Sequence, residues 1–399
     1  MTIRTSTRVL AVAAMVVATP AFAQESLLPT TSWGFAPMAS AWHFSTPLAQ
    51  GAGAITDVMQ FALPLRARTV IGERWTFDVT GAAATSSMKV GAGDSSRTLT
   101  LAGNTDVKLR VSRAFRDDRL LLTAGFNLPV GTTGLDGDQT SVLQMVGAPA
   151  LGMPVGALGV GPGLTLGAAQ AFETGSWSIA FGGSVERRTE YTPISLALVG
   201  GNSLTKIAPG TAAHVTFGAD RPVGQNRLAL LLVADAYTKD QVTVTSGSDA
   251  PATTAYTLGP QVSALARYDV AATGWREAGS TLSLRYRSAF TDAAGTKVSG
   301  SDAAYVEGSI MGVRGGATGV GLVLGADARY HGGMSFTDAL VGAAVRSAGA
   351  TIGVELPSAR FMSRIAARGQ FGQFNTGTTS SNGMGVSLIF AIAARRAAP

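Results

Sequence analysis

The chain has 399 residues, a formal net charge of +6 and no cysteine. The lack of cysteine excludes disulfide scaffolds, thiol catalysis and cysteine-ligated metal centres, and the positive charge is too dispersed for a nucleic-acid surface. Charged residues make up only 14% of the chain, against about a quarter in soluble proteins. Much of its apolar surface must therefore be buried or face lipid.

The first 23 residues have the pattern of a secretory signal peptide. Arg4 and Arg8 form a basic start, residues 9–18 are apolar or small, and Ala21-Phe22-Ala23 is a small-x-small cleavage sequence. An apolar helix of the protein core is the alternative, and it does not explain the cleavage sequence. We expect cleavage before Gln24 and export, with residues 24–399 forming one domain.

No later segment has the composition of a membrane-spanning helix. The longest uncharged run, Gln139–Phe172, is interrupted by Pro149, Pro154 and Pro162, and proline breaks the roughly 20 residues of continuous helix that a bilayer requires. In hydrocarbon, a closed β-barrel is the other structure that satisfies every backbone N–H and C=O group. The composition therefore favours a barrel in the bacterial outer membrane.

The mature chain alternates between apolar and polar residues with the period of a β-strand. Within 281–287, for example, four polar residues alternate with Leu282, Leu284 and Tyr286. Most such segments exceed the five or six residues typical of soluble β-sandwiches and can cross a bilayer at a tilt. We expect strands at 54–67, 74–88, 105–115, 119–130, 158–172, 176–188, 209–219, 226–238, 256–269, 279–291, 302–314, 319–331, 335–347, 359–373 and 383–396.

The number of strands stays open between 14 and 16, because a single-chain bacterial barrel has an even number. A weak segment near 39–47 would give 16 strands, and a different division of 335–373 would give 14. Short turns alternate with longer loops, as in these barrels; the loops are at 89–104, 131–157, 189–208, 239–255, 292–301 and 374–382. The sequence thus predicts an all-β fold, a single closed antiparallel transmembrane β-barrel.

Within each expected strand, the charged residues lie on the same face. That face should line the lumen, because an Arg or Lys side chain at the lipid midplane costs about 2–4 kcal/mol. A basic wall would favour anionic solutes, whereas an internal ladder of ion pairs would hold the strands together. The interleaved acids favour the ladder. The residues expected to line the lumen are Lys108, Arg110, Glu186, Arg188, Arg267, Asp269, Arg285, Arg287, Asp327, Arg329, Arg364 and Arg368.

Loop 131–157 carries more apolar side chains than a loop in water should expose. We expect it either to fold into the barrel mouth, as a first binding site for hydrophobic solutes, or to form an apolar rim. The side chains expected at that binding site are Val142, Met145, Leu151 and Met153, and methionine suits a site that accepts varied ligands.

Two segments resemble known outer-membrane patterns. Thr105–Val111 followed by Gly125–Gly131 is similar to a strand pair of the outer-membrane channels for hydrophobic compounds, the fatty-acid and aromatic-hydrocarbon uptake group. Ser381–Leu388 resembles the C-terminal strand signal read by the barrel-assembly machinery. The resemblances imply a transport barrel that is assembled by this machinery and takes up small hydrophobic or amphipathic molecules.

Catalytic and metal-ligating patterns are sparse. The histidines are His43, His214 and His331, and none has neighbours at metal-ligand spacing. His43-Phe44-Ser45 resembles the His-x-Ser of outer-membrane phospholipases but lacks the flanking glycine and the Asn-Gly pair. We therefore expect no enzyme, no metal and no cofactor.

Three functions are open at this stage. The first is a monomeric channel in contact with outer-membrane lipid that passes small hydrophobic or amphipathic solutes. The second is a structural barrel whose loops bind a partner, and the third is a membrane-embedded hydrolase. A plug or a lateral opening would favour the channel, and a cluster of His, Ser and acid at the rim would favour the hydrolase.

Overall fold

The computed structural model describes residues 33–48, 53–71, 74–91, 95–115, 119–198, 201–246, 250–315, 319–333, 343–358, 361–375 and 380–394. The expected signal peptide and its cleavage position lie outside these residues. Within them, no helix has both the length and the apolar character that a bilayer crossing needs.

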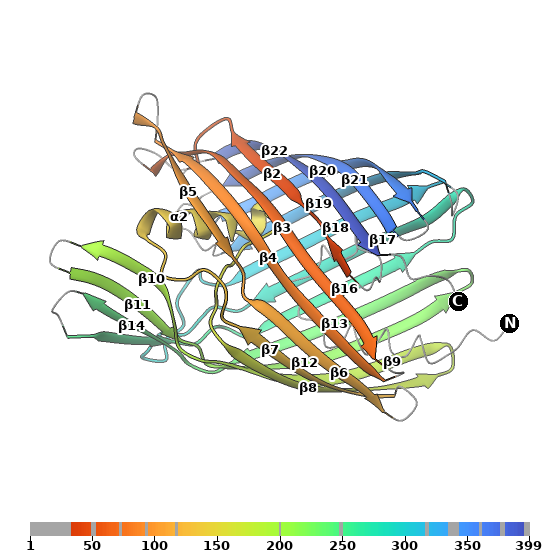
Figure 1. Ribbon diagram of the computed structural model, residues 1–399, viewed down its shortest axis with the longest axis horizontal. Helices are drawn as coiled ribbons and strands as arrows, with labels where there is room; N and C mark the ends of the chain where they lie inside the picture. The colour runs from red at the N-terminus through yellow and green to blue at the C-terminus, as the bar shows by residue number, and fades with distance from the viewer. Residues whose placement is uncertain are drawn as a thin grey trace.

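The main sheet closes on itself as a barrel of sixteen antiparallel strand positions (Figure 1). Two positions are each shared by two short strands in line, β1 (Trp33–Phe35) with β2 (Met38–Phe44) and β5 (Arg97–Asn104) with β6 (Val107–Phe115). The other fourteen are β3 (Ile55–Ile71), β4 (Trp75–Val90), β7 (Leu120–Leu128), β8 (Gly163–Thr174), β9 (Trp177–Arg188), β12 (Thr211–Val223), β13 (Asn226–Tyr237), β16 (Gln261–Asp269), β17 (Trp275–Arg287), β18 (Ala303–Arg314), β19 (Gly321–Gly333), β20 (Ala343–Pro357), β21 (Phe361–Asn375) and β22 (Ser380–Ala394).

Closure occurs where the first strand position meets the last. Strands β1 and β2 pair with β22 on one side and with β3 on the other. Across this seam Ser40 Oγ donates to Ser387 Oγ at 2.9 Å. The expected barrel is confirmed, with the larger of the expected strand numbers, because the weak segment near 39–47 is strand β2.

The wall is apolar outside and largely polar inside, as a strand period of two requires. Exposed outward side chains include Phe126, Leu166 and Ile310. On β17 the exposed Leu284 alternates with Arg285, whose guanidinium lies 5.9 Å from the ring of Tyr305 on β18. A continuous apolar exterior on a closed barrel is the surface of a membrane-spanning protein.

Short turns lie at one end of the barrel and long segments at the other, as expected. The sequence is wrong about segment 89–104, which it predicts as a loop, because β5 occupies Arg97–Asn104. It is also wrong about segments 189–208 and 239–255, which it predicts as loops. They form a second sheet of β10 (Tyr191–Leu198), β11 (Gly201–Ala208), β14 (Asp240–Ser246) and β15 (Ala252–Tyr256) that projects beyond the barrel (Figure 1). Alternating valine and threonine form strand β14, although the Ser, Thr, Gly and Asp of this segment indicated a loop.

The expected strand at 335–347 is also misplaced. Strand β20 runs from Ala343 to Pro357, and residues 334–342 lie outside the described part. The shift arises because β20 is rich in alanine and glycine at both parities, for instance Ala348, Gly349 and Ala350. Such small residues carry little periodic hydrophobic signal.

Candidate functional site: the barrel interior

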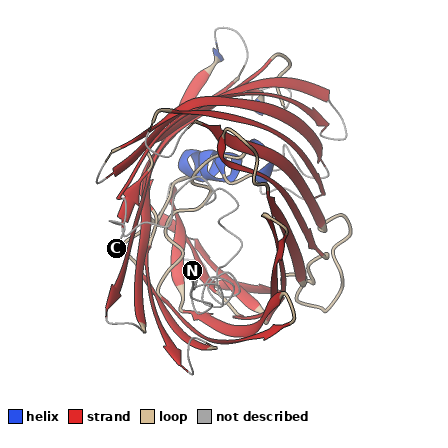
Figure 2. Ribbon diagram, turned by 90° about the vertical axis from the view of Figure 1, so that its right-hand side faces the viewer, coloured by secondary structure: helices blue, strands red, loops and turns tan. Residues whose placement is uncertain are grey.

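The segment between β7 and β8 folds into the barrel and contains helix α2 (Gly137–Val146) and the 3-10 turn η5 (Pro149–Leu151). Figure 2 shows the helix inside the ring of strands, against one part of the wall. Asp136 caps the helix: its Oδ1 accepts from Gln139 N at 2.8 Å, and Gln139 Oε1 accepts from Asp136 N at 3.1 Å. This Asp-x-x-Gln capping box was the available sequence signal for the helix.

An apolar cluster attaches this segment to the wall. Val142, Met145 and Leu151 are buried in one core with Trp42 and Phe374. The rings of Trp42 and Phe374 meet edge to face at 5.4 Å, a favoured aromatic arrangement.

Polar contacts fix the same attachment. Trp42 Nε1 donates to Leu151 O at 2.9 Å. The fully buried Gln60 donates from Nε2 to Val155 O at 2.8 Å and accepts from Val155 N at 2.8 Å; this pair of bonds is called the Gln60 clamp below. At Gly152, φ is +59° and the ideal Cβ position would collide with the guanidinium of Arg329, so only glycine fits there without displacement.

The four side chains expected to bind solutes are buried: Val142, Met145, Leu151 and Met153 are 0–9% exposed. In this structure they are packed away from solvent, and their contact with solutes stays a prediction. They face the wall because burying this apolar area stabilises the inward-folded segment. The segment does lie inside the barrel, as one of the two expectations had it.

On the side of the barrel that carries the segment, the lumen charges form buried ion pairs. Arg368 Nε donates to Asp327 Oδ1 at 2.9 Å, and Arg329 Nε lies 3.1 Å from Glu307 Oε1. Arg364 Nε donates to Glu355 at 2.9 Å. Near the short-turn end, Arg110 and Arg68 share Asp78 at 3.2 and 2.9 Å. These pairs have the geometry of the internal ladder.

The opposite side of the interior is accessible to water. The side chains of Arg267 and Asp269 are 49% and 35% exposed, and those of Arg188 and Glu186 are 32% and 25% exposed. Each pair is ionic, at 2.7 and 3.0 Å, and Lys108 is also exposed. By contrast, the side chains of Arg329, Arg364 and Arg368 are only 7–10% exposed. The part of the wall away from the segment therefore has ion pairs exposed to water on β9 and β16, while Asp220 and Asp235 on the strands between them are buried.

A cluster of arginine and tyrosine lies at the long-loop end of the interior. Arg285, Tyr305 and His331 are successive partners across β17, β18 and β19, and Arg287 follows on the same face. The Nη2 of Arg287 donates to Ser301 O at 3.4 Å, but no described carboxylate lies within ion-pair distance of it. We call Arg285, Arg287, Tyr305 and His331 the arginine cluster.

Buried charge normally has a counter-charge, and the arginine cluster lacks one for Arg287. His331 is 5% exposed, and its Nδ1 has no hydrogen-bond partner among the described groups. Arg287 Nε is likewise buried without a hydrogen-bond partner among the described groups, so it is a donor from which a negatively charged group could accept. Among the described residues, no group of three or more potential ligands could hold a metal ion.

No family model and no curated protein matches the chain. Solved structures with a similar fold include the CymD monoaromatic hydrocarbon channel, at 9% identity over 97% of this chain and 94% of that one, with a TM-score of 0.42. OccK2 of Pseudomonas aeruginosa in complex with glucuronate has 10% identity, coverages of 92% and 99%, and a TM-score of 0.43. A BenF-like porin from Pseudomonas fluorescens has 10% identity, coverages of 92% and 100%, and a TM-score of 0.41. Likeness at this level assigns neither a family nor a substrate.

Proposed function

We propose that the protein is an outer-membrane channel for small amphipathic molecules that carry a negative group. The observation that carries this proposal is the charge that stays accessible on the part of the wall away from the inward-folded segment. There the ion pairs Arg188–Glu186 on β9 and Arg267–Asp269 on β16 are exposed to water. A barrel with a purely structural interior would bury its charges on every side, because unburied ion pairs contribute little stability.

The arginine cluster supports the choice of solute. Arg287 offers donors without an acidic partner, and the ring of Tyr305 offers an apolar face within 5.9 Å of the Arg285 guanidinium. Arginine binds carboxylate groups with two parallel hydrogen bonds. An aromatic carboxylate would satisfy both features at once, whereas a neutral hydrocarbon would leave the buried Arg287 Nε without an acceptor.

The test is reconstitution of the purified protein in planar bilayers, with conductance measured under a salt gradient. We expect anion preference and a dose-dependent block by benzoate, both weakened in Arg287→Gln. Arg346→Gln is the charge-matched control. Arg346 is exposed on β20 and alternates with the buried Val345 and Ser347, so its side chain faces away from the lumen. A folded protein without conductance would favour the alternative, in which the projecting sheet of β10, β11, β14 and β15 binds a partner.

We also propose that the chain is exported by residues 1–23, with Gln24 as the mature N-terminus, and that Ser381–Leu388 is recognised by the barrel-assembly machinery. N-terminal sequencing of protein from outer-membrane fractions tests the cleavage. An uncleaved chain in the inner membrane would contradict it.

A further inference from the structure

Tryptophan is unevenly distributed over the barrel. Near the short-turn end, β1, β4, β9 and β17 each begin with a tryptophan, namely Trp33, Trp75, Trp177 and Trp275. The remaining tryptophan of the chain, Trp42, is buried inside the barrel. On membrane-spanning surfaces, tryptophan concentrates where the apolar band meets the lipid head groups. These residues therefore mark the head-group level at the short-turn end.

Arginine lies over two of these tryptophan rings. The Cζ of Arg113 on β6 is 5.0 Å from the centre of the Trp75 ring, and the Cζ of Arg221 on β12 is 5.4 Å from that of Trp177. Both arginines are exposed, and no described carboxylate lies within ion-pair distance of either. A guanidinium stacked on an aromatic ring keeps the N–H groups at its edge free for an anion.

A third pair lies on β17 and β18, where the exposed Arg314 is the strand partner of Trp275. A Cβ at Gly312 would lie 2.6 Å from the Trp275 ring, so this ring covers Gly312. Val313 is buried in the interior, and its neighbours on either side therefore face outward. Trp275 and Arg314 thus share the outer face, and we call the three pairs the arginine–tryptophan sites.

These sites lie at the edge of the apolar exterior. Ser112 and Ala114 on either side of Arg113 are buried, so Arg113 faces outward by strand alternation. Charge on the lipid face is costly at the midplane and nearly free of cost near the interface, so the arginines lie at the depth of lipid head groups. Toward the middle of the wall, the outward side chains near the sites are exposed and apolar; they include Val79, Phe181, Val215, Leu282 and Ile310.

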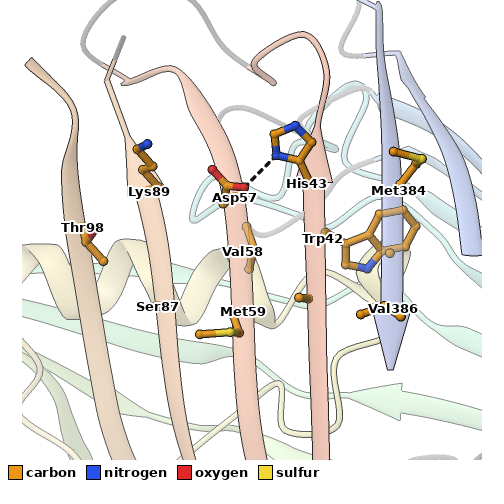
Figure 3. A pocket seen from close by; sticks show the side chains of 12 residues that line it. Trp42, His43, Asp57, Val58, Met59, Ser87, Lys89, Thr98, Met384 and Val386 are labelled. Atoms are coloured by element: carbon orange, nitrogen blue, oxygen red, sulfur yellow. Dashed lines mark hydrogen bonds and ion pairs between the residues drawn. The ribbon is translucent and has the colours of Figure 1, made fainter. Parts of the chain in front are cut away.

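The outward charges near the long-loop end differ, because on β2, β3 and β4 they are of both signs. His43 Nδ1 and Asp57 Oδ1 are 2.7 Å apart there, and Lys89 is the strand partner of Asp57 (Figure 3). Acid and base compensate each other in that row. Near the short-turn end, the outward charges of the described strands are the three arginines of the sites, with no acid among them. Positive charge at this depth is complementary to lipid phosphates.

We propose that the arginine–tryptophan sites bind anionic phospholipids of the leaflet that meets the short-turn end. The guanidinium donates two parallel hydrogen bonds to the phosphate, and the indole ring packs on the glycerol and the first acyl carbons. A zwitterionic lipid binds less well, because its ammonium group competes for the phosphate and is repelled by the arginine. The sites thus select lipids by charge. They face away from the lumen, so the proposal does not depend on channel activity.

The test is quenching of tryptophan fluorescence by brominated phosphatidylglycerol and by brominated phosphatidylcholine. In a variant that combines Trp33→Phe, Trp177→Phe and Trp275→Phe, Trp75 remains as the reporter on the outer face. Adding Trp75→Phe to this variant gives the background from the buried Trp42. We expect phosphatidylglycerol to bind about fivefold more tightly at Trp75, the factor that corresponds to one arginine at an anionic surface.

Adding Arg113→Gln should abolish this preference, and raising the salt concentration should weaken it. The matched control is Arg187→Gln, which removes an exposed arginine from the outer face of β9 near the long-loop end. Arg187 lies between Glu186 and Arg188, whose ion pair is on the lumen face. The preference should persist in this control. Heat-modifiable gel mobility verifies that each variant is folded.

Native mass spectrometry of the unaltered chain gives a measurement that does not depend on the tryptophan replacements. The chain should retain more bound phosphatidylglycerol than phosphatidylcholine. The proposal is overturned if both lipids are retained equally, or if Arg113→Gln keeps the full preference at Trp75. An equal loss in Arg187→Gln would also overturn it, because the net charge of the barrel rather than the site would then set the preference.

Discussion

Replacing Gln60 by leucine should detach the inward-folded segment while leaving the barrel intact. The Gln60 clamp satisfies both backbone groups of Val155 in a buried environment. Each buried polar group left without a hydrogen-bond partner costs about 1–3 kcal/mol. With two such groups, the free energy that holds the segment against the wall should fall by roughly 2–6 kcal/mol. At 1.4 kcal/mol per factor of ten, the detached population should rise roughly 30-fold to 10⁴-fold.

Hydrogen–deuterium exchange of the α2 amides measures this population directly, because helix amides exchange when the segment detaches. Exchange in the strands should stay slow, since ladder hydrogen bonds do not involve the clamp. The matched control is Gln370→Leu, which replaces an inward, buried glutamine on β21 that makes no hydrogen bond to the segment. If α2 exchanges at the same rate in both variants, the clamp does not hold the segment and the reasoning is refuted.

Three further predictions test the register, the glycine at η5 and the projecting sheet. Single cysteines at Leu284 and Arg285 should react with a lipid-phase and a water-phase thiol reagent respectively, and the reverse pattern would mean a register shifted by one. Gly152→Ala should lower the thermal midpoint of unfolding more than Gly224→Ala. Both glycines have φ near +60°, so each alanine incurs about 1–2 kcal/mol of backbone strain. Only at position 152 does the new Cβ also collide with a guanidinium, that of Arg329. Burial, and then the charge of Asp240, raise the pKa of Tyr256 to about 12, so the stability of the projecting sheet should fall between about pH 10 and pH 12. In an absorbance titration, Tyr256→Phe should remove a phenol that ionises near pH 12, and loss of one that ionises near pH 10 would contradict its burial.

The sequence was sufficient for the barrel because strand alternation is a local property. The outward parity of Leu284 and the inward parity of Arg285 follow from their neighbours alone. Strand β20 was misplaced because alanine and glycine carry almost no such signal. The helix α2 was missed for another reason, since three prolines and many glycines nearby outweighed the capping box at Asp136.

The contacts at the candidate sites could not be predicted in the same way. His43 and Asp57 are 14 positions apart, and their contact depends on which residues of β2 and β3 are paired. The alternation of polar and apolar residues along each strand does not specify this pairing. The burial of Met145 likewise depends on which part of the wall the segment meets. Long-range packing of this kind needs the folded structure.

The seam between the first and last strand positions has a consequence for biogenesis. Ser40 and Ser387 are 347 positions apart in the chain, so nearly the whole polypeptide must be synthesised and exported before the ring can be completed. Until then β2 and β22 each present an unpaired edge, which is a template for aggregation. We therefore expect these edges to need protection until the ring closes, and the folding rate to be limited by this single late encounter rather than by hairpin formation.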